Sequence, residues 1–375
     1  MQEVLKNRIT YTNAINICLG KNIHFVAYKL PGEKGISIII QTNTEIKPLE
    51  KLDQQLPSKG FLIAPFHRDN NEAWLIKPDI VLTEDIQTCD LERLNALPSK
   101  PVKLPDRGFP PDTAKEDYIR QIRESIENIK EGAFEKVVLS RVKSVKGNFT
   151  GRLPAIFETL CATYPNAFVY LFYVEGQCWT GATPEPFICS SPEGLKTVSL
   201  AGTRPYRERD MDISNWNNKE LQEQEYVTMH IEKILKNFNI LHFRKTGPYV
   251  ARAGNVLHLR TDFTFPVDTI GNRLPSLIAS LHPTPAVCGM STGKAMDFIK
   301  NAEKHDRGYY AGFLGPVGFS DGIRLYVNLR CLKVFDDRLV LYIGGGITLD
   351  SVPEEEWEET EIKAETLLSV LKQIG

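Results

Sequence analysis

The 375-residue sequence has no apolar run as long as the roughly 18 residues that a membrane-spanning helix needs. Long blocks of like charge are also missing, and the formal net charge is only −2 at pH 7. The first residues, MQEVLKNRIT, lack the apolar block of a signal peptide. These absences argue against a main role in nucleic-acid or membrane binding and predict a cytoplasmic protein.

Paired cysteines are also missing. The seven cysteines are scattered, odd in number, and never spaced as Cys-x-x-Cys. This distribution predicts reduced thiols rather than a zinc site or a disulfide framework. No heptad pattern of a coiled coil is present, so we expect a monomer, with a homodimer as the alternative.

The first part of the chain contains little that points to chemistry. Residues 1–95 alternate strand-like runs such as GISIII with polar, turn-rich segments, without clustered carboxylates or histidines. A proline-rich stretch, Leu97–Asp112, is the best candidate for a boundary, although a connection inside one domain explains it nearly as well. We expect one domain over 1–375, with 1–111 lacking catalytic motifs and 112–375 forming the catalytic core.

Apolar periodicity and turn signals predict the elements of this core. A helix should begin at Thr113, with Glu116 as its capping-box partner, and end at Gly132. Further helices are expected near 152–163, 216–238, 273–281, 292–303 and 354–373, and strands from 136 and near 166–182, 196–201, 241–267 and 309–345. Because short turns join most consecutive strands, the sheets should be antiparallel, in an α+β fold with helices packed outside.

Three glycine-containing motifs resemble known sites without fitting them. GMSTG, at Gly289–Gly293, has the spacing of a hydrolase nucleophile elbow, but the only later histidine is His305 and the preceding segment is rich in proline. STGKA has the wrong spacing to an upstream glycine for a phosphate loop, and Ala295 stands where a hydroxyl should bind the metal. GGG at 344–346 is no dinucleotide fingerprint, but it permits close backbone approach.

Two predicted helices each contain Glu-x-x-Glu, at Glu220 and Glu223 and at Glu356 and Glu359. Residues three apart share a helical face, so each pair points in one direction. A solvated acidic face explains either pair alone, and EEEWEETEIK has the composition of such a face. The alternative is that both faces meet across a cleft and hold Mg²⁺, which prefers oxygen ligands. Spacing does not choose between these interpretations.

Nine segments occur together in a recognisable order. They are FEKVVLSR, GATPE, SLAGTRPY, NKELQEQE, HPTPAVCG, RGYYAGFLG, YVNLRC, YIGGGI and EEEWEETEIK. In this order the chain resembles the chorismate-utilising enzymes, which include anthranilate, aminodeoxychorismate, isochorismate and salicylate synthases. The resemblance covers Thr113 to the C-terminus. It implies one large α+β domain with two packed antiparallel sheets, chorismate as the small-molecule partner, and Mg²⁺ as the cofactor.

Motif variants indicate which member this chain is most like. The amine-adding branches of the family carry Gln where this chain has Lys136, and they use ammonia, which is already a nucleophile. Aminodeoxychorismate synthases carry a nucleophilic lysine where this chain has Ala201. The resemblance therefore implies an isochorismate synthase in which Lys136 is the general base that activates water. An apolar strand disfavours the charged form of a lysine, although an edge lysine in solvent is the plainer interpretation.

The resemblance also implies the other catalytic roles. Glu185, in GATPEPF, matches the residue that protonates the departing C4 hydroxyl, whereas by itself it reads equally well as a loop glutamate. Glu223 and Glu359 would bind Mg²⁺ directly, and Glu220 and Glu356 would act on its waters. The implied reaction adds water at C2 of chorismate, shifts the ring double bonds and gives isochorismate.

Seven further positions match substrate-binding residues of the family. Arg330 and Lys363 would bind the two carboxylates, Gly202, Thr203 and Gly344 would donate backbone N–H groups, and His282 and Tyr310 would line the ring. Read singly, these are a strand-surface arginine, a solvated lysine, and residues of ordinary turns and strands.

Two departures qualify the resemblance. The helix that carries Glu223 usually continues with histidine, whereas this chain has Gln224, which hydrogen-bonds but does not titrate. Salicylate synthases tend to carry polar residues after HPT, whereas this chain has Pro285 and Ala286, which favours a reaction that stops at isochorismate. Salicylate synthase is the alternative function. Isochorismate itself feeds menaquinone or catechol siderophore synthesis.

Overall fold

The computed structural model describes residues 2–43, 45–67, 71–83, 86–99, 104, 108–253 and 256–374, with side chains from Tyr11 onward. Part of the proline-rich stretch that we considered as a boundary lies outside these residues. None of the helices in the described ranges is long and apolar enough to cross a bilayer.

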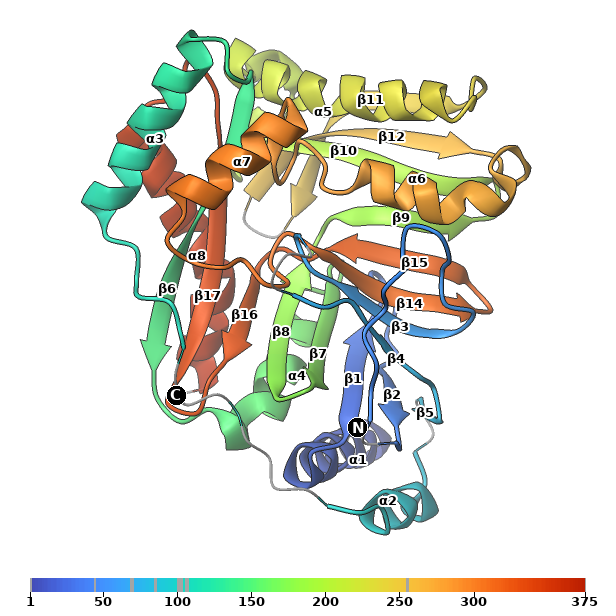
Figure 1. Ribbon diagram of the computed structural model, residues 1–375. Coiled ribbons are helices and arrows are strands. Elements are labelled where there is room, and N and C mark those ends of the chain that lie inside the picture. The colour runs from blue at the N-terminus through green and yellow to red at the C-terminus, as the bar shows by residue number, and fades with distance from the viewer. Residues whose placement is uncertain are drawn as a thin grey trace.

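Two antiparallel sheets form the centre of the described structure. The nine-stranded sheet has the order β13 (Gly289–Met290), β6 (Lys136–Lys146), β17 (Arg338–Ile347), β16 (Cys331–Val334), β8 (Gln177–Thr183), β7 (Phe168–Val174), β1 (His24–Lys29), β2 (Ser37–Gln41) and β5 (Ile80–Leu82). The eight-stranded sheet has the order β11 (Arg244–Ala253), β12 (Val256–Phe265), β10 (Gly194–Pro205), β9 (Pro186–Ser191), β15 (Gly322–Val327), β14 (Phe313–Phe319), β3 (Gly60–Ala64) and β4 (Trp74–Ile76). In Figure 1 the strands of the first sheet run up and down, and those of the second run across the view.

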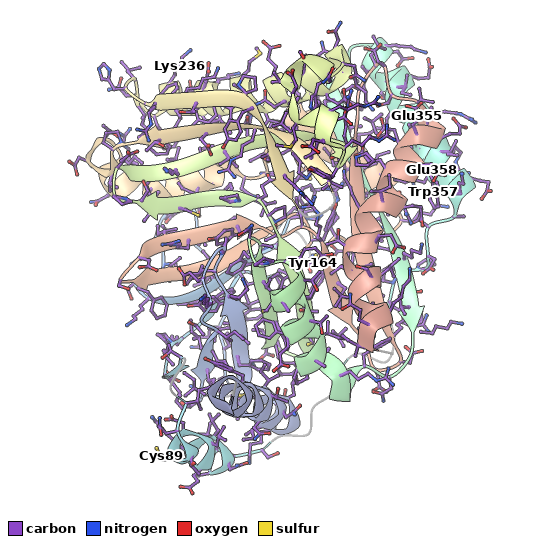
Figure 2. The ribbon with its side chains drawn as sticks, turned by 180° about the vertical axis from the view of Figure 1, so that it is seen from behind. Cys89, Tyr164, Lys236, Glu355, Trp357 and Glu358 are labelled. Atoms are coloured by element: carbon purple, nitrogen blue, oxygen red, sulfur yellow. The ribbon has the colours of Figure 1, made fainter. Side chains whose placement is uncertain are left out.

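The helices lie outside the sheets (Figure 1). They are α1 (Gln2–Lys21), α2 (Thr88–Asn95), α3 (Lys115–Lys130), α4 (Leu153–Thr163), α5 (Asn218–Asn237), α6 (Leu274–Leu281), α7 (Thr292–Ala302) and α8 (Pro353–Ile374). Seen from behind in Figure 2, α4 and α8 lie side by side over the nine-stranded sheet, and Tyr164 at the end of α4 donates a hydrogen bond to the Thr366 carbonyl at 2.8 Å. The predicted α+β architecture with outer helices is confirmed.

Strand β7 shows why the apolar run FVYLFYV is buried throughout. Phe168, Tyr170 and Phe172 belong to the main core cluster, which includes residues of both sheets. Val169 and Leu171 belong to a second cluster, which includes residues of α1, α4 and α8. Because successive side chains of a strand point to opposite faces, a strand covered on both faces needs a continuous apolar run.

Strands from the N-terminal portion lie inside both sheets. β1 pairs with β7 in the nine-stranded sheet, and β3 pairs with β14 in the eight-stranded sheet. This portion therefore completes the same two sheets that carry the predicted catalytic motifs, and its strands cover edges that β7 and β14 would otherwise expose.

Two details of the sequence-based prediction are wrong. The segments 2–21 and 88–95 form helices, α1 and α2, where we expected strand-like and turn-rich structure. The capping box at Thr113 is absent, because α3 begins after Ala114 without a side-chain cap. Thr113 instead pairs with β6, where its hydroxyl accepts a hydrogen bond from the Val142 N–H at 3.2 Å.

Candidate active site

Lys136 is the first residue of β6, and β13 and β17 flank this strand. Its side chain is completely buried, and its Nζ lies 3.0 Å from Oε1 of Glu223 on α5. The contact is an ion pair without hydrogen-bond geometry, and the Lys136 amine has no hydrogen-bond partner among the described residues. The interpretation as an edge lysine in solvent is therefore excluded, and a buried amine with unused donors is typical of a reactive site.

Two glycines near the end of β17, Gly344 and Gly346, leave room for neighbouring side chains. A Cβ atom on Gly346 would lie 2.3 Å from Oε1 of Glu223 and 3.1 Å from Cε of Lys136. A Cβ atom on Gly344 would lie 2.6 Å from the hydroxyl of Tyr310. The close approach that GGG permits is therefore made at Gly344 and Gly346 by the Tyr310 and Glu223 side chains, because a larger residue at either position would occupy their space.

Helix α8 is fixed against β6 by Arg141. This buried side chain donates from Nε to the Thr360 hydroxyl at 2.7 Å and pairs with the Glu361 carboxylate. Its guanidinium also lies 4.1 Å from the centre of the Trp357 ring. These contacts join one face of α8 to the sheet and fix the rotation of the helix about its axis.

The acidic segment of α8 has both a solvent face and an inner face. Glu355 and Glu358 are exposed and point outward in Figure 2. Glu356 is buried, whereas Glu359 and Lys363 are partly buried and lie 2.7 Å apart, measured between Oε1 and Nζ. The solvated-face interpretation is correct for part of this segment, and the inner residues recur at the helical spacing needed to face one site.

The four predicted metal ligands all contact basic side chains. The pairs are Glu220 with Arg204, Glu223 with Lys136, Glu356 with Lys219, and Glu359 with Lys363. In the described part of the chain, no three metal-ligating side chains already converge on one point. Metal binding therefore requires some of these ion pairs to open.

Glu220 differs from the other three glutamates in the partners that its carboxylate contacts. Arg204 holds it in a bidentate pair, with Nε 2.6 Å from Oε1 and Nη2 3.0 Å from Oε2. Its carboxylate also accepts from the Asn217 N–H as part of the capping box that begins α5. These contacts use both oxygens and account for Glu220 without a metal.

The other three glutamates share a cationic neighbour. The Lys219 ammonium contacts Glu356, and its charge also acts on Glu359 and Glu223. Burial raises the pKa of Glu356 to about 7, the like charge of Glu359 adds to this effect, and Lys219 opposes it. The Lys219 ammonium thus compensates part of the negative charge of the three carboxylates. Carboxylate oxygens are hard donors, and a donor set of this kind fits Mg²⁺.

Glu223 lies in the wall of a pocket whose empty space, including the part open to solvent, is about 760 Å³. Its lining includes Glu185, Gly202, Thr203, Glu223, His258, Ala286, Tyr310, Arg330, Gly344 and Lys363. All of the predicted substrate-binding residues except His282 therefore line one cavity. The pairing register between β10 and β12 skips Gly202 and Thr203, which places both in a local irregularity at the pocket wall.

Glu185 lies between β8 and β9 with only 4% of its surface exposed. Burial raises the pKa of Glu185 to about 7, although the positive charges of Arg330 and Lys136 oppose the shift. The carboxyl therefore holds its proton near neutral pH, as a general acid must.

Arg330 is held by a histidine that sequence analysis missed. Its Nη2 donates to Nε2 of His258 at 2.8 Å, and Nδ1 of His258 lies 2.8 Å from the Gly202 carbonyl. Burial, assisted by the charge of Arg330, lowers the pKa of His258 to about 3, so the ring is neutral. Nδ1 then carries the proton and Nε2 accepts from Arg330, which fixes the tautomer.

His282 requires a correction, because it does not line this pocket. Its Nε2 hydrogen-bonds the carbonyls of Pro65 and Phe66 at 3.2 and 3.0 Å, and its ring packs edge-on against Phe313. It lines a separate, mostly apolar cavity beside α6. His282 is the C-cap residue of α6, and its side chain therefore lies beside that helix. Ala286 and Val287, which come later in the same HPTPAVCG segment, are the residues that line the pocket.

Gln224 has a structural role in place of the expected histidine. Its Nε2 lies 2.8 Å from Ser199 Oγ, 3.0 Å from Thr228 Oγ1 and 2.7 Å from Thr261 Oγ1. This buried network joins α5 to β10 and β12 and thereby supports the position of Glu223 at the pocket.

Comparison with known proteins decides the family. The family described as chorismate binding enzyme matches residues 73–372. The chain belongs to this family. This member of the chorismate binding enzymes is 28% identical over 262 residues to the vibriobactin-specific isochorismate synthase of Vibrio cholerae. The matched region covers 68% of this chain and 66% of that protein. It is 29% identical over 264 residues to the isochorismate synthase MenF of Bacillus subtilis, and this matched region covers 68% of this chain and 56% of that protein.

An isochorismate synthase and an anthranilate synthase of solved structure share this fold. The menaquinone-specific isochorismate synthase MenF of Escherichia coli superposes with a TM-score of 0.76 at 22% identity, covering 96% of this chain and 91% of that one. Anthranilate synthase component I of Streptococcus pneumoniae gives a TM-score of 0.65 at 18% identity, with 92% of each chain covered. At these identities the superpositions establish the fold alone.

Proposed function

We propose that the protein is an isochorismate synthase, which converts chorismate into isochorismate. Two observations together carry the proposal. A fully buried lysine, Lys136, contacts the pocket residue Glu223, and a buried glutamate in the same pocket wall, Glu185, keeps its proton to about pH 7. Two relatives named as isochorismate synthases support the same reaction. A base and an acid at one substrate suit the exchange of one hydroxyl group for another.

In the proposed reaction, Lys136 takes a proton from water and the resulting oxygen nucleophile attacks C2 of chorismate. The ring double bonds shift, and the C4–oxygen bond breaks as Glu185 supplies the proton with which that oxygen leaves as water. One water enters and one leaves, so the conversion is an isomerisation. Lys136 acts as a base only when it is neutral, so its ion pair with Glu223 must open first.

Arg330 and Lys363 would bind the two carboxylates of the substrate. Arg330 offers a planar fork suited to a carboxylate, and His258 fixes its direction. Lys363 already donates from Nζ to the Gly344 carbonyl at 3.0 Å, which holds its ammonium at the pocket wall. These cations hold the ring so that C2 and C4 face the base and the acid.

Glu223, Glu356 and Glu359 would hold Mg²⁺ in this proposal, and Glu220 would remain with Arg204. When bound, the metal supplies a positive charge that holds and neutralises the ring carboxylate.

The proposal is tested by incubating the protein with chorismate and Mg²⁺ and identifying the products by chromatography. We expect isochorismate with oxygen from labelled water, and loss of activity after chelation of the metal. Salicylate with pyruvate would establish the alternative lyase reaction, and an amine product in the presence of ammonia would overturn water addition. The apolar Ala286 at the pocket wall favours isochorismate as the end product.

Lys136→Gln should lower kcat for isochorismate formation by about 10²- to 10⁴-fold, because the variant has no base to activate water. Lys146→Gln is the matched control, since Lys146 is the exposed last residue of the same strand. Rates are measured with saturating chorismate and Mg²⁺. Full activity of the Lys136 variant would contradict the assignment of the base.

A further inference from the structure

A buried ion pair lies behind the pocket and takes no direct part in the proposed reaction. Glu303 follows α7, Arg307 comes four residues later, and each side chain is only 2% exposed. Arg307 donates from Nε to Oε2 of Glu303 at 2.9 Å and from Nη2 to Oε1 at 2.5 Å. The Phe66 ring lies against the guanidinium, at 4.3 Å from its centre.

Such a pair is not explained by stability alone. Removing two charges from water has a large cost, and hydrophobic residues of similar volume at buried ion pairs are often neutral or stabilising. A pair whose guanidinium makes four hydrogen bonds is instead suited to hold several backbone segments in one arrangement.

The remaining contacts of the pair reach three parts of the pocket wall. Arg307 donates to the Val287 carbonyl at 2.8 Å and to the Val138 carbonyl at 2.6 Å. Its guanidinium also lies 5.9 Å from the centre of the Tyr310 ring. Val138, Val287 and Tyr310 all line the pocket, but they come from β6, from the segment before β13 and from the loop before β14.

The carboxylate completes the connection to β6. Glu303 Oε1 accepts from the Ser140 N–H at 2.6 Å, and its Oε2 lies 3.5 Å from Nε2 of His305. The hydroxyl of Ser140 in turn lies 2.8 Å from the same His305 nitrogen. The pair therefore fixes β6 at two residues, only a few positions from Lys136.

We infer that Glu303 and Arg307 are positioning residues that hold Val138, Val287 and Tyr310 in the arrangement that places the substrate ring between base and acid. This inference rests on the proposed function, because the ring is that of chorismate. The pair touches neither Arg330 nor Lys363, so it governs the geometry of reaction more than the binding of the substrate carboxylates.

The main test replaces both charges at once, with Glu303→Leu and Arg307→Met in one protein. No charge is left unpaired, so the variant should fold, with a thermal midpoint within about 5 °C of the wild type. We expect kcat to fall by about tenfold to a hundredfold, while KM for chorismate changes by less than about threefold.

The number of binding sites per chain distinguishes a misplaced substrate ring from a loss of folded protein. In a Glu185→Gln background, where turnover should stop, calorimetry with chorismate should still give one site per chain for the doubly substituted protein. If kcat falls only in proportion to lost binding sites, the pair is merely structural and the inference is overturned.

Arg307→Lys gives a second measurement that leaves the charge opposite Glu303 in place. A lysine cannot bond Glu303 in two places and also reach both carbonyls, so kcat should again fall, by a smaller factor. Glu193→Leu with Arg244→Met is the matched control, since this Arg–Glu pair is exposed and neither residue lines the pocket. Unchanged kcat in both Arg307 variants overturns the inference, whereas an inactive wild type overturns the proposed function itself.

Discussion

At the residue scale, the direction of Arg330 depends on a neutral histidine. His258 donates to the Gly202 carbonyl and accepts from Arg330, and burial lowers its pKa to about 3. A charged imidazolium would have no lone pair for the guanidinium and would repel it. The arginine can therefore serve as a carboxylate ligand only because its neighbour stays uncharged throughout the working pH range.

His258→Ala should raise KM for chorismate by about tenfold, since a lost hydrogen bond to a charged group leaves Arg330 free to turn away. The value of kcat should change less, because Lys136 and Glu185 remain in place. Steady-state kinetics measure both constants, and His242→Ala at an exposed position is the control. An unchanged KM would show that Arg330 keeps its direction without the histidine.

The sequence identifies site residues that lie in short motifs and misses those that act through others. Lys136 and Glu185 lie in segments that carry the resemblance to the chorismate-utilising enzymes, so their placement at one site could be expected from that resemblance. His258 is a single histidine in the strand segment VLHLR, where alternation indicates only a half-buried strand. Its partners, Gly202 and Arg330, are remote in sequence, and only the sheet brings them together.

At the element scale, the end of β17 depends on the absence of side chains at particular positions. Gly346→Ala would place a Cβ atom 2.3 Å from the Glu223 carboxylate and force Glu223 and Lys136 apart. We expect a loss of about 1–3 kcal/mol in the free energy of unfolding and a fall in kcat of at least about tenfold.

Gly345→Ala is the matched control on the neighbouring residue. Its added Cβ atom would meet nothing closer than 3.6 Å, which is ordinary van der Waals contact. Denaturant unfolding and steady-state rates should therefore separate the two alanine variants. Equal behaviour would mean that the Glu223 and Lys136 side chains move aside without loss of function.

Elements with strong periodicity are predicted well, and α1 shows how one was missed. In its described part, Tyr11, Ala14, Ile15 and Cys18 are buried. This spacing of i, i+3, i+4 and i+7 is the helical signal, but asparagine and threonine between these residues lower the helix propensity of the segment. The order of strands in the sheets could not be predicted, because pairing of remote strands leaves no local trace.

At the scale of the whole molecule, Glu185 links the chemistry of the site to global stability. Burial raises its pKa from 4.5 to about 7, against the opposing charges of Arg330, Lys136, Arg260 and Lys363. Between these two values the folded protein binds more protons than the unfolded chain. The stabilising contribution of Glu185 is therefore fully present below pH 4.5 and is lost as the pH rises through about 7.

Glu185→Gln removes this titration, because an amide stays neutral at every pH. From about pH 5 to about pH 6.5, the free energy of unfolding of the wild type should fall relative to the variant by at most about 1.4 kcal/mol per pH unit. Urea unfolding of both proteins measures this difference, and Glu355→Gln is an exposed control for the change in charge. Other buried carboxyls, such as Glu356, titrate in both proteins and cancel. Parallel curves would mean that Glu185 is already ionised at acidic pH, which would remove the proton that the proposed acid must donate.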